Sequence, residues 1–464
     1  MTKYVPTIGL EIHAELKTET KMFCNSKNDP DETRPNVNVC PICMGHPGTL
    51  PTINKEAVAH VLKVGTAVRG TLADFTEFDR KNYFYPDIPK GYQISQYKYP
   101  LVSGGSIGDV DITRIHLEED TGVSKHHGTH SDIDFNRAGL PLMELVTEPV
   151  IHDVEQAVRF AKDLQLLLRY LGVAHANMEK GEMRVEVNIS LAKEDAKELG
   201  TKTEIKNLNS FKAVARGIEY EIKRQTALLD SDEEVVQETR GWDEATQTTV
   251  GQRKKETSAD YRYFPEPDLP KLKISSVTEW QSFTLPELPS ERRKRYSLLG
   301  LKQEDADSFT ADKALGDFFD AVTEHLAENE YALAANYIAA DLVGLAQSLD
   351  NFQYPDAQHF AELITMTTAG DLSSRGAKDT LKIMVTKGGI PRTIAEDEGL
   401  LQDNDEETLL ETVKTILSEN QKAVDEYKSG KENALQFLVG QGMKASKGAA
   451  NPQMLRELFL KHLE

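Results

Sequence analysis

The amino-acid sequence predicts an α+β protein, with a mostly antiparallel sheet domain first, then an all-α helical domain and a small helical tail. Short runs that alternate between apolar and polar residues fill the first 290 or so residues, as strands with one buried face do. After residues 285–295, which carry two prolines and a basic run, the pattern is helical almost throughout. The chain has 464 residues, enough for several domains, and the boundaries that we predict are 1–290, 291–400 and 401–464.

The segment 8–16 is the clearest predicted strand and the first candidate site. Its apolar residues recur at every second position, so they share one face. The other face presents Glu11, His13 and Glu15, which are two carboxylates and an imidazole in a row. Such a row is suited to holding a cation; a half-buried strand with a solvated polar face is the alternative.

A second segment, 183–191, alternates in the same way. Its polar row contains Arg184, Glu186, Asn188 and Ser190. Two strands of this design predict a sheet with one face on a core and the other face lining a cleft, a pattern that antiparallel sheets allow.

Two further acidic segments fit this arrangement. Residues 140–146 are apolar except for Glu144, and a carboxylate in such a run needs a partner, either a metal ion or an arginine such as Arg137. Residues 116–120 pack three acids beside a histidine, and the alternation breaks near Arg114. On composition alone this second segment favours a solvated turn.

Helical patterns follow the strands. Residues 153–171 form an amphipathic stripe with a capping pair, Asp153 and Gln156, at the start and Gly172 at the end. We expect further helices and connections as follows: helices at 211–229, 332–349, 407–427 and 454–462, an acidic surface connection at 394–407, and a glycine-rich loop at 441–452.

The charge balance limits the function classes. Acidic residues outnumber basic ones by 75 to 54, which gives a formal net charge of −21. This argues against general adhesion to nucleic acid or anionic membranes, although it leaves local basic patches open. There is no run of about 18 uncharged apolar residues, and residues 1–5 lack a secretory apolar stretch. We therefore expect a cytoplasmic protein without membrane association.

The cysteines are Cys24, Cys40 and Cys43. Their odd number argues against a disulfide framework. Cys40 and Cys43 have the C-x2-C spacing of a zinc knuckle, Cys24 is a candidate third ligand and His46 a candidate fourth. An empty knuckle is the alternative, and the sequence leaves zinc occupancy open.

Several long motifs in a fixed order resemble one family, the B subunits of the bacterial tRNA-dependent amidotransferases. The motifs are 8–16 (IGLEIHAEL), 78–87 (FDRKNYFYPD), 117–122 (LEEDTG), 134–144 (DFNRAGLPLME), 204–211 (EIKNLNSF), 238–244 (ETRGWDE), 260–268 (DYRYFPEPD) and 444–452 (KASKGAANP). The resemblance implies a cradle-like α+β domain, a helical domain and a helical tail.

The resemblance also implies a ligase activity. Members of the family use ATP to phosphorylate the side-chain carboxylate of Glu-tRNA(Gln) or Asp-tRNA(Asn). Ammonia from a partner glutaminase (amidase) subunit then replaces the phosphate, and a small belt subunit wraps the other two. A non-catalytic tRNA-binding scaffold is the alternative function. A larger archaeal-type relative is another, but the chain length leaves little room for its inserted domain.

The resemblance assigns roles to the acids and bases. The expected catalytic Mg²⁺ ligands are Glu11, His13, Glu119, Glu144 and Glu186. Oxygen ligands suit Mg²⁺, and Mn²⁺ is an alternative because of the histidine. Glu186 departs from the family pattern, which can have aspartate there.

Basic residues complete the expected nucleotide and tRNA sites. Those expected to contact ATP phosphates or substrate are Arg80, Lys81, Arg184 and Lys206. A solvent-facing lysine is the alternative for Lys81. Those expected to contact tRNA are Lys444, Lys447 and Lys461 in a tail that is locally basic. An ordinary solubilising helix face is the alternative for the tail.

Overall fold

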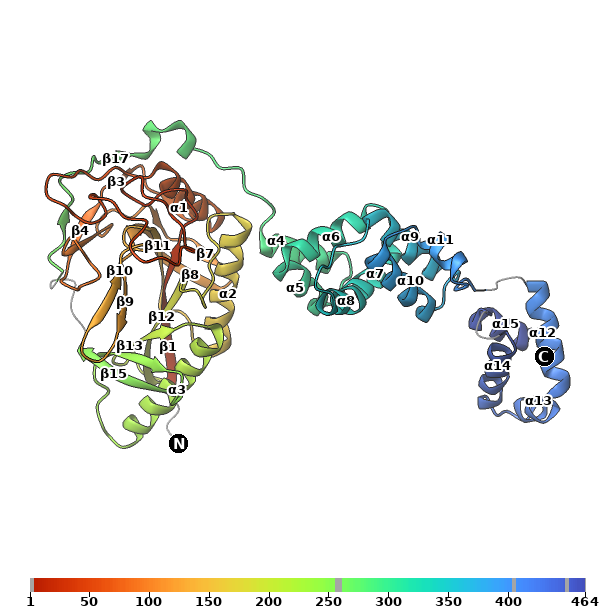
Figure 1. Cartoon of the computed structure of the whole chain (residues 1–464). Helices are drawn as coiled ribbons and strands as arrows, with labels where there is room; N and C mark the ends of the chain where they lie inside the picture. The colour runs from red at the N-terminus through yellow and green to blue at the C-terminus, as the bar shows by residue number, and fades with distance from the viewer. Residues whose placement is uncertain (1–3, 255–260, 403–405, 447–449, 464) are drawn as a thin grey trace. The chain divides into compact units, whose positions relative to one another are not determined.

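The chain divides into two compact units, Met1–Pro289 and Ser290–Glu464. A computed structural model describes residues 4–254, 261–402, 406–446 and 450–463. Figure 1 shows a sheet domain in the first unit and helices in the second, so the expected α+β class is confirmed. The predicted subdivision of the second unit near residue 400 stays a prediction.

One large sheet organises the first unit. In the described part of the chain it has 10 strands, in the order β15–β14–β13–β12–β1–β11–β8–β6–β2, with β7 paired to β8. Strands β13 and β14 run parallel, and the other neighbours run antiparallel. The strands are β1 (Tyr4–Glu15), β2 (Thr71–Leu72), β6 (Val102–Ser103), β7 (Ser106–Ile107), β8 (Val110–Glu119), β11 (Pro141–Thr147), β12 (Met183–Lys193), β13 (Thr203–Leu208), β14 (Glu238–Asp243) and β15 (Thr248–Lys254).

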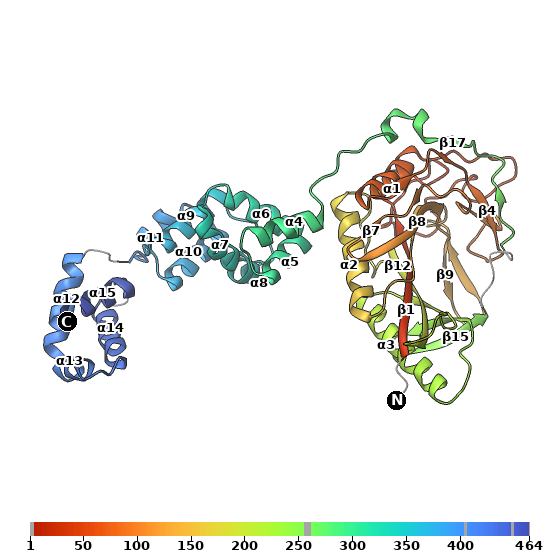
Figure 2. The ribbon, with the colours of Figure 1, turned by 180° about the vertical axis from the view of Figure 1, so that it is seen from behind.

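Three helices cover the apolar face of this sheet, α1 (Lys55–Ala67), α2 (Val154–Tyr170) and α3 (Phe211–Asp230) (Figure 1 and Figure 2). The structure confirms the predicted strands and helices to within four residues at each end; they are the strands 8–16 and 183–191 and the helices 153–171 and 211–229. Leu10 and Ile12 of β1 are fully buried beneath the helices. Asp153 caps α2 by accepting a hydrogen bond from the backbone N–H of Gln156 at 2.7 Å. The opposite face of the sheet is therefore left for polar side chains.

Shorter strands form smaller sheets in the first unit. They are β3 (Phe75–Thr76) with β17 (Leu272–Lys273), β9 (Val123–His126) with β10 (Ser131–Asp134), and β5 (Tyr92–Ser95) and β16 (Phe264–Pro265) on either side of β4 (Asp79–Asn82). Two 3-10 turns follow, η1 (Ile274–Ser276) and η2 (Thr278–Trp280). The pairing of β4 with β16 joins two of the family-like motifs that are far apart in sequence.

The second unit is helical and holds two hydrophobic clusters, one built from residues 296–395 and one from residues 409–463. Its elements are α4 (Pro289–Leu298), α5 (Gln303–Ala311), α6 (Lys313–Thr323), η3 (Glu328–Glu330), α7 (Tyr331–Asn336), η4 (Tyr337–Leu342), α8 (Val343–Ser348), α9 (Ala357–Thr368), α10 (Ser374–Lys387), α11 (Pro391–Asp397), α12 (Glu406–Glu419), α13 (Gln421–Lys428), α14 (Asn433–Ala445) and α15 (Pro452–Leu463). The predicted helix 332–349 is helical but contains the π-helical turn η4.

Two predictions for the tail need correction. The predicted helix 407–427 is broken at Asn420, whose backbone leaves the helical region. The predicted loop 441–452 is helical as far as Ala445. Gly442 has no side chain, so α14 packs closely against α15 at this point, and the packing favours the helix. A Cβ at Gly442 would lie 2.9 Å from a methyl group of Leu455. No helix in the described ranges is long and apolar enough to span a membrane.

Candidate active site

The polar face of the large sheet brings four of the five expected metal ligands together. In the antiparallel register, His13 of β1 lies opposite Glu144 of β11, and Glu11 of β1 lies opposite Glu186 of β12. His13 Nε2 is 3.2 Å from Glu144 Oε2. Strand alternation therefore places the acids where the sequence predicted, on one surface.

Three residues that the sequence analysis did not select complete this group. His116 and Glu118 come from β8, and Glu204 comes from β13. His116 Nε2 lies 3.5 Å from Glu144 Oε2, and Glu118 Oε1 lies 3.7 Å from His13 Nε2. Ligand atoms converge in three overlapping sets, which are Glu11–His13–Glu144, His116–Glu118–Glu144 and Glu11–Glu186–Glu204. We call these seven residues the acidic cluster.

The reading of 116–120 as a solvated turn is wrong. Residues 110–119 form β8, and the acids of this segment are buried at 2 to 5% exposure. The break in alternation near Arg114 is a register shift, since Val146 pairs with Arg114 and the next residue of β11 pairs with Ile112. The extra residue conceals the strand when only the sequence is considered.

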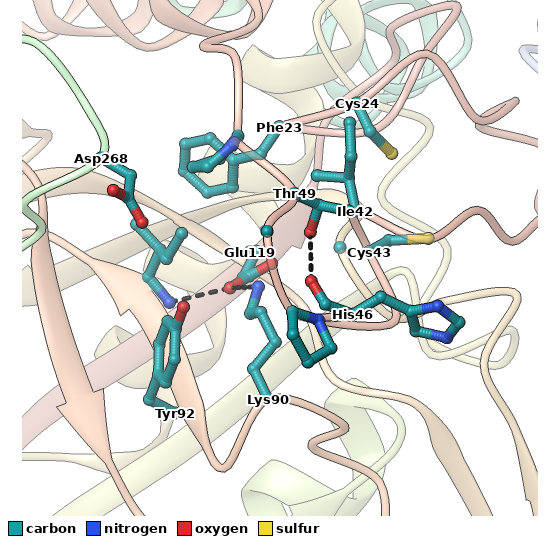
Figure 3. Close-up of a pocket in the computed structure, with 16 residues that line it drawn as sticks. Phe23, Cys24, Ile42, Cys43, His46, Thr49, Lys90, Tyr92, Glu119 and Asp268 are labelled. Atoms are coloured by element: carbon teal, nitrogen blue, oxygen red, sulfur yellow. Dashed lines mark hydrogen bonds and ion pairs between the residues drawn. The ribbon is translucent and has the colours of Figure 1, made fainter.

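Glu119 does not lie in the acidic cluster, which corrects its expected place there. Its carboxylate pairs with the Lys90 ammonium and accepts the backbone N–H of Ile94 at 2.9 Å. Both groups line a cavity of about 200 Å³ that Tyr92 also borders (Figure 3). Adjacent residues of a strand point to opposite faces, so Glu118 takes the position that was expected for Glu119.

Crowding of buried charges shifts the acidic cluster's pKa values in opposite directions. Burial, with the charges of Glu144 and Glu186, raises the pKa of Glu11 to about 7. Burial alone would lower the pKa of His13, but its hydrogen bond to Glu144 and the nearby carboxylates raise it to about 9. The pKa of Glu144 is well below its usual value despite burial, because His116 and His13 stabilise the carboxylate.

The donor set of the acidic cluster fits a divalent cation. Its carboxylates are the oxygen ligands that Mg²⁺ prefers. The buried Nδ1 atoms of His13 and His116 have no hydrogen-bond partner among the described residues. Histidine–carboxylate contacts join His13 and His116 to Glu144, and a bound cation would replace or reinforce them.

Lys81, which was expected to contact ATP phosphates, interacts electrostatically with the acidic cluster. Burial would lower its pKa, but the charges of Glu118 and several neighbours, including Glu144, raise it well above the usual value. Its ammonium also lies 5.1 Å from the ring centre of Tyr261. The solvent-facing alternative does not hold for this residue, which is half-buried.

The other expected phosphate-binding cations already have carboxylate partners. Arg80 donates two hydrogen bonds to Glu266, at 2.6 and 2.7 Å. Arg184 binds Asp120 through two bonds of 2.9 and 3.1 Å. Lys206 Nζ lies 2.7 Å from Glu186 Oε2, at the edge of the acidic cluster.

Arg137 is not the partner of Glu144 that the sequence suggested. It donates instead to the carbonyl oxygens of Thr121 and Gly122, each at 3.0 Å. The nearest arginine contact of Glu144 is Arg114, at 3.3 Å. Its main partners are the two histidines described above.

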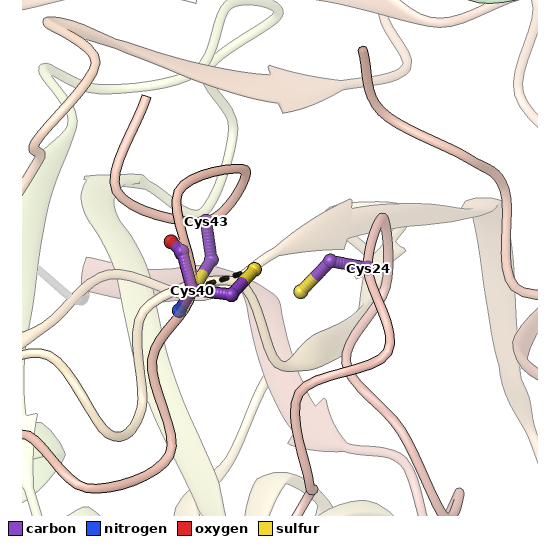
Figure 4. A group of neighbouring side chains, drawn as sticks. All are labelled: Cys24, Cys40 and Cys43. Carbon is purple, nitrogen blue, oxygen red and sulfur yellow. Dashed lines mark hydrogen bonds between the residues drawn. The ribbon is translucent and has the colours of Figure 1, made fainter. Parts of the chain in front are cut away.

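The three cysteines form a second candidate metal site (Figure 4). Their sulfur atoms lie within 4.8 Å of one another, and Cys43 Sγ is 3.8 Å from Cys40 Sγ. The side chain of His46 is exposed and is not part of the converging set, whereas Lys21 donates to Cys43 Sγ at 3.8 Å. Structural zinc is held by four ligands, so these three thiols fit a zinc ion whose fourth ligand comes from another group.

The predicted tRNA contacts in the tail lie on exposed helix surfaces where they are described. Lys444 is exposed near the end of α14, and Lys461 is exposed on α15, with Nζ 3.9 Å from Glu406 Oε1. Lys447 lies outside the described residues.

Comparisons with known proteins define the class to which this fold and site belong. A family model described as the GatB/GatE catalytic domain matches residues 6–279, more than half of the chain, and includes every member of the acidic cluster. A second model, described as GatB domain, matches residues 317–463.

Curated relatives match over the full length. One from Synechocystis, named as the B subunit of an aspartyl/glutamyl-tRNA(Asn/Gln) amidotransferase, is 43% identical over 493 residues, covering 100% of this chain and 98% of the relative. A protein of the same name from Dehalococcoides mccartyi is 43% identical, with 100% of both chains covered. A third, from Caldanaerobacter subterraneus, is 43% identical with 99% of both covered. The chain therefore belongs to the GatB family of amidotransferase B subunits.

Proposed function

We propose that this chain is the ATP-dependent, amide-forming component of a tRNA-dependent amidotransferase. Its substrates are the side-chain carboxylates of Glu-tRNA(Gln), Asp-tRNA(Asn) or both, and its products are Gln-tRNA(Gln) and Asn-tRNA(Asn). The family match and the relatives' name support the reaction class. The observation that carries the proposal is the acidic cluster on the polar face of the catalytic domain.

The proposed reaction has two steps. A carboxylate oxygen of the aminoacyl group attacks the γ-phosphorus of ATP, and ADP leaves. Ammonia then attacks the carbonyl carbon of the acyl phosphate, and inorganic phosphate leaves as the C–O bond breaks. Both reactants of the first step are anionic, so the enzyme must neutralise charge and align the groups. Bound Mg²⁺ would supply the neutralisation.

The chain's own residues have distinct roles in this scheme. The acidic cluster holds the cation on the sheet. Lys81 interacts electrostatically with Glu118 and Glu144, and its proposed role is to contact a phosphate oxygen. Arg184 and Lys206 are each oriented by a carboxylate, and their proposed role is to contact phosphate or substrate. Glu119 stands outside this set and holds Lys90 in its own cavity.

The proposal includes partners and a compartment. The relatives' name is that of one subunit, so each is one part of a complex of several subunits. We propose a glutaminase (amidase) partner as the ammonia source, a small belt partner that wraps both, mischarged tRNA as the substrate carrier, and the cytoplasm as the location. We also propose that Cys24, Cys40 and Cys43 hold a structural zinc ion and that the tail contacts tRNA.

Glu144→Gln in the co-purified complex tests the function. Glu144 belongs to two of the three ligand sets, so its loss should lower ATP-dependent transamidation by about 100-fold or more. Binding of mischarged tRNA should stay within about two-fold, because phosphate and shape contacts elsewhere dominate tRNA affinity. The readout is formation of amidated tRNA from each mischarged tRNA, ATP and glutamine.

The matched control is Glu148→Gln, four positions along the chain. Glu148 is partly exposed, accepts a hydrogen bond from Thr113 at 2.7 Å and is not a member of the acidic cluster. It should transamidate normally. Normal transamidation by Glu144→Gln would instead favour the non-catalytic scaffold.

A further inference from the structure

A continuous chain of tyrosine rings lies beside Lys81. In order, the contacts are Tyr85–Tyr83 at 5.9 Å between ring centres, Tyr83–Tyr261 at 5.8 Å, Tyr261–Tyr263 at 6.0 Å and Tyr263–Tyr97 at 4.4 Å. The last pair is stacked, with an angle of 11° between the rings. We call these five residues the tyrosine arc.

The backbone holds the tyrosine arc in place. Asn82, the last residue of β4, donates hydrogen bonds that fix the neighbouring segment: its N–H donates to the carbonyl oxygen of Tyr261 at 2.9 Å, and its side-chain amide donates to the carbonyl of Arg262 at 2.9 Å. Arg262 adopts a left-handed backbone with φ of 46°. This turn places tyrosines on either side of it in the same arc, so the ring surface is organised before any ligand binds.

The two ends of the tyrosine arc are open to solvent. Tyr97 is 54% exposed and Tyr85 is 46% exposed, and Phe84 beside Tyr85 is 77% exposed. The exposed rings offer flat apolar faces on which a planar group can stack. Aromatic rings stack with unpaired nucleobases, which are commonly recognised in this way at single-stranded ends.

The middle of the tyrosine arc reaches the reaction site. The Lys81 ammonium lies 5.1 Å from the ring centre of Tyr261 and 5.8 Å from that of Tyr83. The same ammonium interacts electrostatically with Glu118 and Glu144 of the acidic cluster. The middle of the tyrosine arc therefore lies against the cation that interacts with these acids.

We propose that the tyrosine arc is the stacking platform for the 3′-terminal nucleotide of the aminoacyl-tRNA, with Tyr97 as its outermost ring. This inference rests on the proposed function. The terminal nucleotide carries the aminoacyl ester. One substrate molecule can therefore place its base on the tyrosine arc and its side-chain carboxylate at the acidic cluster.

The charges favour the tRNA end over the adenine of ATP. Lys98 and Arg262 are exposed and adjoin Tyr97 and Tyr263 in sequence, in a chain whose net charge is −21. They are suited to the backbone phosphate of a polynucleotide, outside the acidic cluster. ATP offers no such further phosphate, because its own phosphates must lie at the acidic cluster.

The experiment compares Tyr97→Ala and Tyr97→Phe in the co-purified complex. Loss of one stacked base typically weakens binding by about 10-fold or more, so Tyr97→Ala should raise the KM for mischarged tRNA by roughly that factor. Tyr97→Phe keeps the ring and should restore the wild-type KM within about two-fold. The KM for ATP should not change in either variant. The matched control is Tyr354→Ala, which removes an exposed tyrosine stacked on Phe318 in the second unit.

A binding measurement without catalysis separates this inference from the proposed function. Wild-type complex should bind intact tRNA more tightly than tRNA lacking its terminal adenosine, whereas Tyr97→Ala should bind both equally. An unchanged tRNA KM in Tyr97→Ala would overturn the inference, as would a rise in the KM for ATP instead. A wild-type complex that discriminates the two tRNAs through Tyr97 but does not transamidate would refute the proposed function and leave the platform standing.

Discussion

Glu118 and Glu119 offer a direct test of which strand face forms the metal site. We consider Glu118→Gln and Glu119→Gln, which each remove one charge and keep the shape of the side chain. Glu118 Oε1 lies 3.7 Å from His13 Nε2, and its other oxygen accepts the hydroxyl of Ser95 at 2.8 Å. The Glu119 carboxylate pairs with the Lys90 ammonium and accepts a hydrogen bond from the backbone N–H of Ile94. The two substitutions are chemically identical and one residue apart.

The expected magnitude follows from the geometry. Glu118 belongs to one of the converging ligand sets, so its charge lies within a few ångströms of a bound cation. Two unit charges about 4 Å apart interact by about 4 kcal/mol at an effective dielectric constant of 20. The remaining carboxylates compensate in part, so we expect Glu118→Gln to weaken divalent-ion binding by about 10- to 100-fold, or roughly 1.4 to 2.7 kcal/mol. Glu119→Gln should change it by less than about two-fold, because its charge faces the other side of β8.

The assay is a Mn²⁺ titration of the co-purified complex, with free Mn²⁺ measured by electron paramagnetic resonance. Circular dichroism and thermal unfolding check that both variants fold, since each loses a buried charge-assisted hydrogen bond. A 10-fold or greater loss of Mn²⁺ affinity in Glu119→Gln, with wild-type affinity in Glu118→Gln, would refute the assignment of faces. Equal losses in both would refute the separation of Glu119 from the acidic cluster.

Three further predictions concern the rest of the chain. Deleting residues 401–464 should raise the KM for mischarged tRNA by about 10-fold or more and leave ATP binding nearly unchanged, because the exposed lysines of the tail contribute phosphate contacts; equal loss of both would contradict this. The purified complex should contain zinc by elemental analysis, and Cys40→Ser should lower that content, whereas an unchanged zinc content would exclude the cysteine site. Asp320→Asn should destabilise the second unit by about 2 kcal/mol at pH 7, because Asp320 accepts hydrogen bonds from the buried Arg292 at 2.7 Å and from Arg295 at 2.8 Å. Partial burial would raise the pKa of Asp320, but these arginines lower it below its unfolded-state value of 3.8. The stability that Asp320 contributes is therefore present above pH 3.8 and is lost as pH falls through the pKa of the folded state. The free energies of unfolding of the wild type and Asp320→Asn, measured with urea, should converge as pH falls below about 4. A constant difference between them at all pH values would disprove the electrostatic origin.

The strands and their faces were predictable because burial of one face imposes a period of two. In β1, Leu10 and Ile12 are fully buried and Glu11 and His13 project from the other side, as the alternation in 8–16 requires. The same holds for β12 with Glu186. A one-residue slip would bury the acids, so the apolar pattern fixes which residues share the polar face. It does not fix which strands are neighbours.

The membership of the cluster could not be obtained from composition. Glu118 and Glu119 are identical in type, and the register shift near Arg114 conceals that the alternation resumes at 115–118, which would group Glu118 with His116 on the polar face. His116 pairs with Glu144 only because β8 lies beside β11. Which strands lie side by side depends on the packing of the whole sheet, so it cannot be predicted from the sequence of one segment.

Shared ligands give the acidic cluster its organisation. Glu11 belongs to the sets on both sides of β1, and Glu144 belongs to the sets on both sides of β11, whereas Glu204 belongs to one set at the edge. Each shared carboxylate therefore joins cation-binding groups contributed by different strands. Since β1 and β11 are paired with each other and each is bonded to a further strand on its other edge, these two carboxylates stand on backbone that is hydrogen-bonded on both sides. A site that must bring two anionic substrates into line benefits from that placement, because small displacements of its central ligands would misalign the phosphoryl group and the carboxylate together.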